Sequence, residues 1–321
     1  MITPEQAGWF HETFETLVDN VSQAVLGKQH TVRLAFTAML AEGHLLLEDA
    51  PGTGKTSLAR SLAATVQGTH NRIQFTPDLL PSDVTGVSVY DQGQNRFEFH
   101  RGPIFASIVL ADEINRASPK TQSALLEVME ESRVTVDGEP HSVGRPFMVI
   151  ATQNPIEQAG TYRLPEAQLD RFLLKTSLGY PDHASTVQIL AGSATRDRTD
   201  GLRPRITTDA VADMADMAAD VHVDDAVLDY ISRLAEATRT DTRTRLGVSV
   251  RGCLALVRCA KVWAAAQGRA FVVPDDVKDL AEPVLAHRLV LDVESEFAGV
   301  TAPEIIQDVL ATTAPPVERV G

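Results

Sequence analysis

Hydrophobic and polar positions follow two different patterns along this chain. Between about residues 21 and 180, short apolar runs alternate with segments of helical spacing, which is typical of a parallel α/β sheet. Four of the five runs are continuously apolar, as expected for strands that helices cover on both faces. The predicted core strands are His44–Glu48, Arg72–Phe75, Ser107–Asp112, Phe147–Thr152 and Leu173–Ser177.

The last third of the chain has the other pattern. After Thr207, apolar residues recur at i, i+3 and i+4, which predicts a wholly helical region. Before it, Gly192–Pro204 is polar and has no apolar periodicity, so we interpret it as a linker. The sequence thus predicts an α/β domain over residues 1–190, a linker at 191–206 and a helical domain at 207–321. The predicted helices are Asp209–Ala219, Asp225–Thr238, Ser249–Ala266, Pro274–His287 and Ala302–Leu310.

Length and composition are those of a soluble globular protein. The chain has 321 residues, enough for two domains, with 44% hydrophobic and 22% charged residues. No apolar run approaches the roughly 18 residues that span a membrane, and the acidic N-terminus lacks the basic start of a secretory signal. We therefore expect a cytoplasmic protein. The net charge of −14 argues against wrapping nucleic acid, although a locally basic pore would be compatible with it.

The two cysteines and nine histidines indicate neither a disulfide nor a metal centre. Cys253 and Cys259 are six residues apart in a predicted helix, so they lie ~9 Å apart, beyond disulfide reach. We interpret both as packing residues. The histidines show no paired metal-ligand spacing.

A glycine-rich turn with Lys-Thr at its end follows the first predicted strand. Gly52 and Gly54 lack a Cβ, so backbone N–H groups can close around phosphate oxygens at a helix N-terminus. Lys55 would reach the β- and γ-phosphates, and the Thr56 hydroxyl would ligate Mg²⁺. The strict motif has Gly where this chain has Asp49, and the alternative reading is a plain turn between a strand and a helix. The residues predicted to bind the nucleotide are Asp49, Ala50, Pro51, Gly52, Thr53, Gly54, Lys55, Thr56 and Ser57.

Two further predicted strands end in polar residues. Asp112 and Glu113 follow an apolar run, where Asp112 would hold Mg²⁺ through its water shell and Glu113 would polarise an attacking water. The alternative for this pair is an acidic helix N-terminus. Asn154 ends the next strand and can hydrogen-bond both water and a γ-phosphate. Its alternative is a turn residue before Pro155.

With these elements in this order, the chain resembles the AAA+ ATPases and is most similar to their MoxR family, over roughly residues 24–286. The resemblance implies a P-loop AAA+ core with hairpin inserts, an all-helical lid domain, and hydrolysis of ATP with Mg²⁺. Four segments carry it: Gln74–Asp83, Asp112–Ala117, Ala151–Glu157 and Leu164–Phe172.

The resemblance also implies catalytic roles. Asn154 corresponds to the polar sensor beside the water. Arg171 corresponds to the arginine finger, which in this class reaches the neighbouring subunit's nucleotide; its alternative is a surface arginine after a helix. Arg251 corresponds to the second sensor arginine, although the family usually has Ser-Pro-Arg where this chain has Ser249-Val250-Arg251.

A finger that acts on a neighbour implies a homo-oligomer, and the family resemblance implies a hexameric ring. The predicted hairpins Val87–Arg101 and Arg133–Val143 would face its pore or partners, or else be plain surface hairpins.

The family resemblance further implies chaperone-like maturation or metal-centre assembly of client proteins, with a von Willebrand factor A-domain partner. Two alternatives stay open at this point: a slowly hydrolysing nucleotide-gated scaffold, and a nucleic-acid-associated motor. Turnover that rises with added client would separate the first from a working machine, and salt-sensitive DNA binding would support the second.

Overall fold

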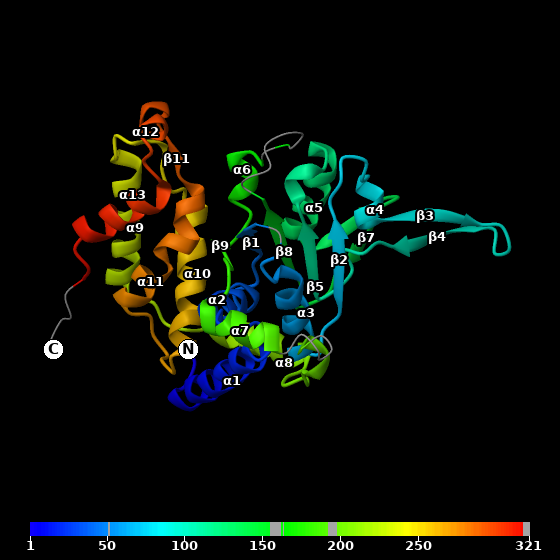
Figure 1. Ribbon diagram of the computed structural model, residues 1–321, viewed down its shortest axis with the longest axis horizontal. Helices are drawn as coiled ribbons and strands as arrows, with labels where there is room; N and C mark the ends of the chain where they lie inside the picture. Colours follow the sequence, from blue (N-terminus) through cyan, green and yellow to red (C-terminus); the bar gives the residue numbers. More distant parts are fainter. Residues whose placement is uncertain (51, 155–161, 163, 192–197, 317–321) are drawn as a thin grey trace. The chain divides into compact units, whose positions relative to one another are not determined.

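The computed structural model describes residues 1–50, 52–154, 162, 164–191 and 198–316 (Figure 1). The chain forms two compact units. The α/β unit comprises Thr16–Leu164 and Thr176–Ala212, and the helical unit comprises Met1–Glu15, Pro165–Lys175 and Asp213–Gly321. The helical unit is thus built from three stretches of chain, whereas the sequence suggests one; the domain limits at residues 190 and 206 stay predictions. In the described part of the chain, no helix has both the length and the apolar character to cross a membrane.

The five predicted core strands form one sheet, as the sequence predicts. The pairs β2–β5, β5–β8 and β8–β1 are parallel, and the runs are apolar because β5 and most of β8 are buried. Strand β1 alone departs from the order of the chain, because it lies between β8 and β9, and helices lie between consecutive core strands along the chain. Across the sheet the strands are β2 (His70–Gln74), β5 (Ile108–Asp112), β8 (Met148–Gln153), β1 (Leu45–Glu48) and β9 (Leu174–Thr176).

The crossover helices of the α/β unit start at clear sequence signals. Helix α5 (Pro119–Glu131) begins with proline after Ser118, whose hydroxyl accepts a hydrogen bond from the Thr121 N–H. Helix α3 (Lys55–Thr65) follows the glycine-rich turn and packs on β2 and β5. Helix α1 (Pro4–Ser22) contributes residues to both units. The other elements are α2 (Gln29–Leu40), α3 (Lys55–Thr65), α4 (Pro81–Thr85), α7 (His183–Ala191), η1 (Ile114–Arg116) and η2 (Arg198–Gly201). The first part of the predicted linker, residues 192–197, lies outside the described residues.

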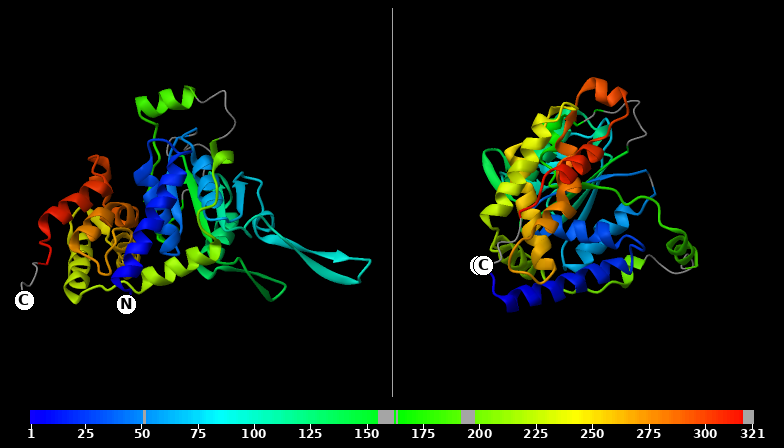
Figure 2. Two further views of the ribbon diagram at one scale, coloured as in Figure 1. Left: turned by 90° about the horizontal axis from the view of Figure 1, so that it is seen from below. Right: turned by 90° about the vertical axis from the view of Figure 1, so that its left-hand side faces the viewer.

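Both predicted hairpins are present. Strands β3 (Gly86–Asp91) and β4 (Arg96–Arg101) form the longer one, which extends away from the sheet in both figures (Figure 2). Strands β6 (Arg133–Val136) and β7 (Glu139–Ser142) form the other around an Asp-Gly turn with positive φ at both residues. The ring of Phe99 stacks on His141 with centroids 4.3 Å apart, so the two hairpins touch. A pore-facing role for them stays a prediction.

In the helical unit, α10 (Val250–Ala266) and α11 (Pro274–Leu285) pack together and contribute many of the buried residues. Burial raises the pKa of the Cys259 thiol to about 12, so this free cysteine is an inert packing residue, as predicted. The unit also contains a two-stranded antiparallel sheet, β10 (Thr244–Leu246) with β11 (Val290–Leu291), which is too short for its pattern to be seen in the sequence. The helices are α6 (Glu166–Leu169), α8 (Thr208–Ala219), α9 (Asp225–Thr240), α10 (Val250–Ala266), α11 (Pro274–Leu285), η3 (Ala286–Arg288), α12 (Val293–Phe297) and α13 (Ala302–Thr312).

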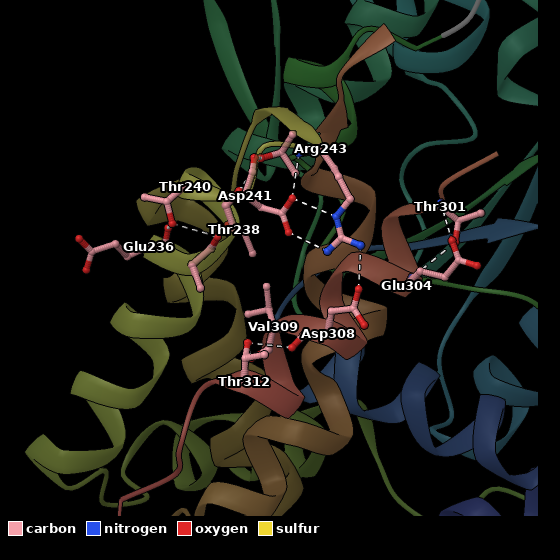
Figure 3. Close-up of polar contacts among 12 residues, drawn as sticks. Glu236, Thr238, Thr240, Asp241, Arg243, Thr301, Glu304, Asp308, Val309 and Thr312 are labelled. Carbon is pink, nitrogen blue, oxygen red and sulfur yellow. Dashed lines mark hydrogen bonds and ion pairs between the residues drawn. The ribbon is translucent and has the colours of Figure 1, made fainter. Parts of the chain in front are cut away.

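One arginine connects three parts of the helical unit. Arg243, just before β10, donates to both carboxylate oxygens of Asp241 at the end of α9, at 3.0 and 2.7 Å. Its third contact is with Asp308 of α13, at 2.7 Å (Figure 3). Asp241 is largely buried, whereas the Asp308 side chain is 60% exposed. The pair with Asp241 therefore contributes most of the stabilisation, because water screens the other one.

We predict that Arg243→Met lowers the free energy of unfolding by about 1–2 kcal/mol at neutral pH, because a charge-assisted pair is lost. The hydrogen bond from Arg243 lowers the pKa of Asp241 in the folded protein below its ordinary value of 3.8. This contribution is therefore complete above the unfolded pKa and is lost as the pH falls through the folded pKa. Urea unfolding of both proteins should show a difference that shrinks below about pH 4. A difference that stays constant to about pH 3 would contradict the assignment.

Candidate functional site

The glycine-rich turn leads from β1 into α3. Gly54 has φ 97° and is the N-cap of the helix, and Gly52 has φ 82°, so both lie in the left-handed region that favours glycine. A Cβ built on either one would meet no atom within 4 Å. The space beside both glycine Cα atoms is therefore open, and the helix that follows begins with the free N–H groups that commonly bind an anion.

Polar side chains of the turn lie along its backbone. The Lys55 ammonium donates to the carbonyl oxygens of Asp49 and Ala50, both at 3.2 Å. The Thr53 hydroxyl donates to the same Ala50 carbonyl at 3.3 Å. Lys55 and Thr56 are half-buried in the first turn of α3, as is Ser57. Of the predicted nucleotide-binding residues, Pro51 lies outside the described part of the chain.

Asp49, the residue that departs from the strict motif, has a structural function. Its side chain is buried, and its two carboxylate oxygens accept hydrogen bonds from the N–H groups of Leu178 and Gly179, at 2.6 and 2.8 Å. Its own N–H donates to the carbonyl of Gln153 at the end of β8. A glycine could make only the last of these bonds. The carboxylate therefore ties the start of the turn to the segment after β9.

A single hydroxyl on β8, that of Thr152, hydrogen-bonds to both Asp112 and Glu113. The Thr152 hydroxyl donates to Asp112 Oδ1 at 2.7 Å and accepts from the Glu113 N–H at 2.8 Å. Thr152 is fully buried, so this hydroxyl is held without competing water. Glu113 itself has φ 58°, a conformation that non-glycine residues rarely adopt and that is common at functional sites.

The two carboxylates have further partners that the sequence did not indicate. Arg72 forms an ion pair with Asp112 Oδ2 at 2.6 Å. Gln74 and Arg116 both donate to Glu113 Oε2, at 2.7 and 2.9 Å. Arg72 and Gln74 are two residues apart on β2, so they share a face, and Gln74 is paired in register with Asp112. The polar residues of β2 are visible in the sequence, but their function can be inferred only when β5 is known to be the neighbouring strand.

The sheet order brings the segments that follow β5, β8 and β1 to the same end of the sheet. Strand β8 lies between β5 and β1, and neighbouring strands are ~4.8 Å apart. Asn154, buried directly after β8, therefore lies between the Asp112–Glu113 end of β5 and the turn after β1. These residues lie at the carboxyl ends of parallel strands, which is where such folds bind ligands.

The oxygen ligands at this end of the sheet fit a Mg²⁺ ion that is bound to a nucleotide. The Thr56 hydroxyl and the Asp112 carboxylate offer oxygen, and Mg²⁺ usually binds through one or two carboxylates plus substrate phosphates. The described residues contain no group of three or more His, Cys, Asp or Glu side chains that could hold a metal ion.

The remaining candidates, Arg171 and Arg251, belong to the helical unit. Arg171 follows α6 and is half-buried. Arg251 is exposed in the first turn of α10, where Ser249 caps the helix by accepting from the Gly252 N–H at 3.2 Å. Val250 occupies the first helical position, which is the position that tolerates proline best. The helix therefore begins at this point without the proline that the family pattern has, and the roles of both arginines stay predictions.

Comparison with known proteins agrees with this geometry. Residues 44–174 match the family "ATPase family associated with various cellular activities (AAA)", and residues 236–309 match the AAA lid domain. The uncharacterized protein YeaC of Bacillus subtilis is 45% identical over 96% of this chain and 97% of its own length. Chaperone MoxR1 of Mycobacterium tuberculosis is 39% identical over 95% of this chain and 82% of its own.

Solved structures give the same result. A crystal structure from Cytophaga hutchinsonii, described as that of a candidate ATPase, superimposes with a TM-score of 0.91 at 35% identity, covering 98% of each chain. The AAA and lid matches, the relatives and this structure account for nearly the whole length of the protein. The chain therefore belongs to the MoxR family of AAA+ ATPases, which are ATP hydrolases.

Proposed function

We propose that this ATPase requires Mg²⁺ and couples ATP hydrolysis to chaperone-like remodelling of client proteins, including maturation or assembly of their metal centres. The observation that carries the proposal is the Thr152 hydroxyl, which holds Asp112 and Glu113 together beside the glycine-rich turn. The chaperone role is supported by the similarity to Chaperone MoxR1. We also propose a cytoplasmic location, where ATP is available, and a von Willebrand factor A-domain partner.

Nucleotide binding uses the turn after β1. The N–H groups at the start of α3 would contact phosphate oxygens, and Lys55 would leave the carbonyls of Asp49 and Ala50 to neutralise the β- and γ-phosphates. Thr56 and Asp112 would hold Mg²⁺, which neutralises charge on the phosphates during their cleavage. Arg72 keeps the Asp112 carboxylate in place through Oδ2.

Hydrolysis requires a water molecule in line with the γ-phosphate. Glu113 would accept a proton from this water while the water oxygen bonds to phosphorus and the bond to the β-phosphate oxygen breaks, releasing ADP and phosphate. Gln74 and Arg116 both donate to Oε2 of Glu113, so Oε1 is the oxygen suited to accept from the water. Asn154 would orient the water from the end of β8.

Arg171 would complete this site from the adjacent subunit. AAA+ ATPases commonly form oligomers, and a finger in trans makes hydrolysis dependent on assembly. We propose a homo-oligomer in the form of a hexameric ring, in which Arg171 of one copy stabilises the charge on the γ-phosphate bound to the next. Arg251 would sense the nucleotide from the lid.

We predict different defects for the lysine and the glutamate. Lys55→Ala should weaken ATP affinity about 10- to 100-fold, because it removes a charged contact with ground-state phosphates. Glu113→Gln should bind ATP normally and lose ~10²–10⁴ in turnover, because Glu113 acts on the water. Equilibrium nucleotide binding and single-turnover rates measure both. Wild-type turnover by Glu113→Gln would remove this residue from the mechanism.

The shared hydroxyl gives a second prediction. Thr152→Val keeps the shape of the side chain but leaves Asp112 Oδ1 and the Glu113 N–H without their common partner. Loss of such a supporting contact at a metal site typically costs about 10- to 100-fold in metal affinity or activity. We expect the Mg²⁺ concentration for half-maximal ATPase activity to rise by this factor. Thr152→Ser, which keeps the hydroxyl, is the matched control, and equal effects of the two substitutions would refute the bridging role.

The trans assignment of Arg171 is tested by mixing two inactive proteins. Arg171→Ala should bind ATP normally and lose ~10³–10⁵ in turnover. When it is mixed with Glu113→Gln, some interfaces combine an intact Glu113 with an intact Arg171 of the neighbour, so ATPase activity should return. A finger that acts within its own subunit cannot be rescued in this way. No recovery, despite subunit exchange shown with labelled protein, would disprove the trans arrangement.

A further inference from the structure

Arg288, at the end of η3, forms an extensive set of hydrogen bonds with the segment that contains Arg171. Its Nε donates to Asp170 Oδ1 at 2.7 Å. Nη2 donates to the carbonyl of Phe172 at 2.8 Å, and Nη1 to that of Leu173 at 3.3 Å. All of these residues belong to the helical unit. The guanidinium thus bonds to the residues on both sides of Arg171.

The burial of this arginine makes the contacts specific. Only 3% of the Arg288 side chain is exposed, and an arginine is almost never buried to this extent unless its donors are paired. Burial lowers the pKa of Arg288, and the charge of Asp170 opposes this shift. The carbonyl of Val284 in α11 accepts a further bond from Nη1. A planar group with five fixed N–H donors can satisfy these acceptors together, and a lysine ammonium cannot.

Two neighbours fix the position of Arg288. His287 is buried with Nε2 3.0 Å from the Phe172 carbonyl, and burial lowers its pKa well below the ordinary value, so the ring stays neutral beside the guanidinium. Gly252, in the first turn of α10, faces the aliphatic part of Arg288. A Cβ at Gly252 would lie 2.9 Å from Arg288 Cδ and 2.8 Å from Val248 Cγ1. Only glycine leaves room for the arginine at this point.

We propose that Arg288 is a positioning residue for Arg171: it holds residues 170–173 against α10 and α11, so that the finger is presented to the neighbouring subunit's nucleotide in one orientation. The proposal rests on the trans role of Arg171 proposed above. The contacts fix the backbone before and after Arg171, and therefore the direction in which its side chain leaves. A misplacement of about 1 Å in a catalytic group can cost ~10²-fold in rate.

The test uses Arg288→Lys, which keeps the charge, and Arg288→Met, which keeps only the aliphatic stem. Both should lower turnover about 100-fold while ATP affinity stays that of the wild type. Mixed with Glu113→Gln, each should recover activity, because the partner supplies a correctly held finger. Mixed with Arg171→Ala, neither should recover, because no subunit then presents one. A variant that had lost its own nucleotide site would give the opposite pattern: no recovery with Glu113→Gln, and recovery with Arg171→Ala, whose intact site would receive its finger.

Arg243→Met is the matched control. Its wild-type arginine also pairs with carboxylates in the helical unit, but its hydrogen bonds go to Asp241 and Asp308 and not to residues 165–175. This variant should lose stability and keep turnover. If the Arg288 variants keep wild-type turnover as well, the positioning role is refuted.

Two further outcomes decide the proposal. If Arg171→Ala recovers with Glu113→Gln and the Arg288 variants do not, Arg288 does not act through the finger, and the trans role of Arg171 stands. If neither mixture recovers, the trans role fails and the proposal fails with it. Should the Arg288 variants not fold by circular dichroism, Gly252→Ala takes their place. This substitution keeps Arg288 but forces its Cδ to move, so we expect the same pattern of recovery. If Gly252→Ala does not recover with Glu113→Gln while Arg171→Ala does, the proposal is refuted.

Discussion

The candidate site depends on the parallel pairing of β5, β8 and β1. Ala111 is in register with Ala151, and Glu48 with Gln153, so the three strands end at nearly the same level. This register alone lets Thr152 bond to the end of β5 while the next residues of β8 reach the turn after β1. A slip of one residue would turn the Thr152 hydroxyl to the opposite face of the sheet and break its hydrogen bonds to Asp112 and Glu113.

Much of this site follows from local sequence signals. Continuous apolar runs identify four of the five strands because helices bury both faces of the sheet. The glycines at 52 and 54 followed by Lys55 indicate a turn with positive φ at the start of a helix, and the structure has φ 82° and 97° there. Each of these signals spans only a few consecutive residues, so it can be recognised in a single sequence without knowledge of the fold.

The partners that hold the site could not be read in this way. Asp49 bonds to N–H groups 129 and 130 residues later, and Arg72 bonds to a carboxylate 40 residues later on a neighbouring strand. Such contacts depend on which strands are adjacent, and periodicity does not specify that. The same holds for Arg288, whose position near the end of a predicted helix gave no indication that it contacts residues on both sides of Arg171.

The central claim is that one subunit supplies the phosphate-binding turn and Glu113, and the next subunit supplies Arg171. The most direct measurement is a structure of assembled Glu113→Gln protein with ATP and Mg²⁺ bound. The account predicts a γ-phosphate in contact with Lys55 of one copy and with the Arg171 guanidinium of its neighbour. A γ-phosphate contacted by Arg171 of the same copy, or an Arg171 that contacts no nucleotide, would contradict it.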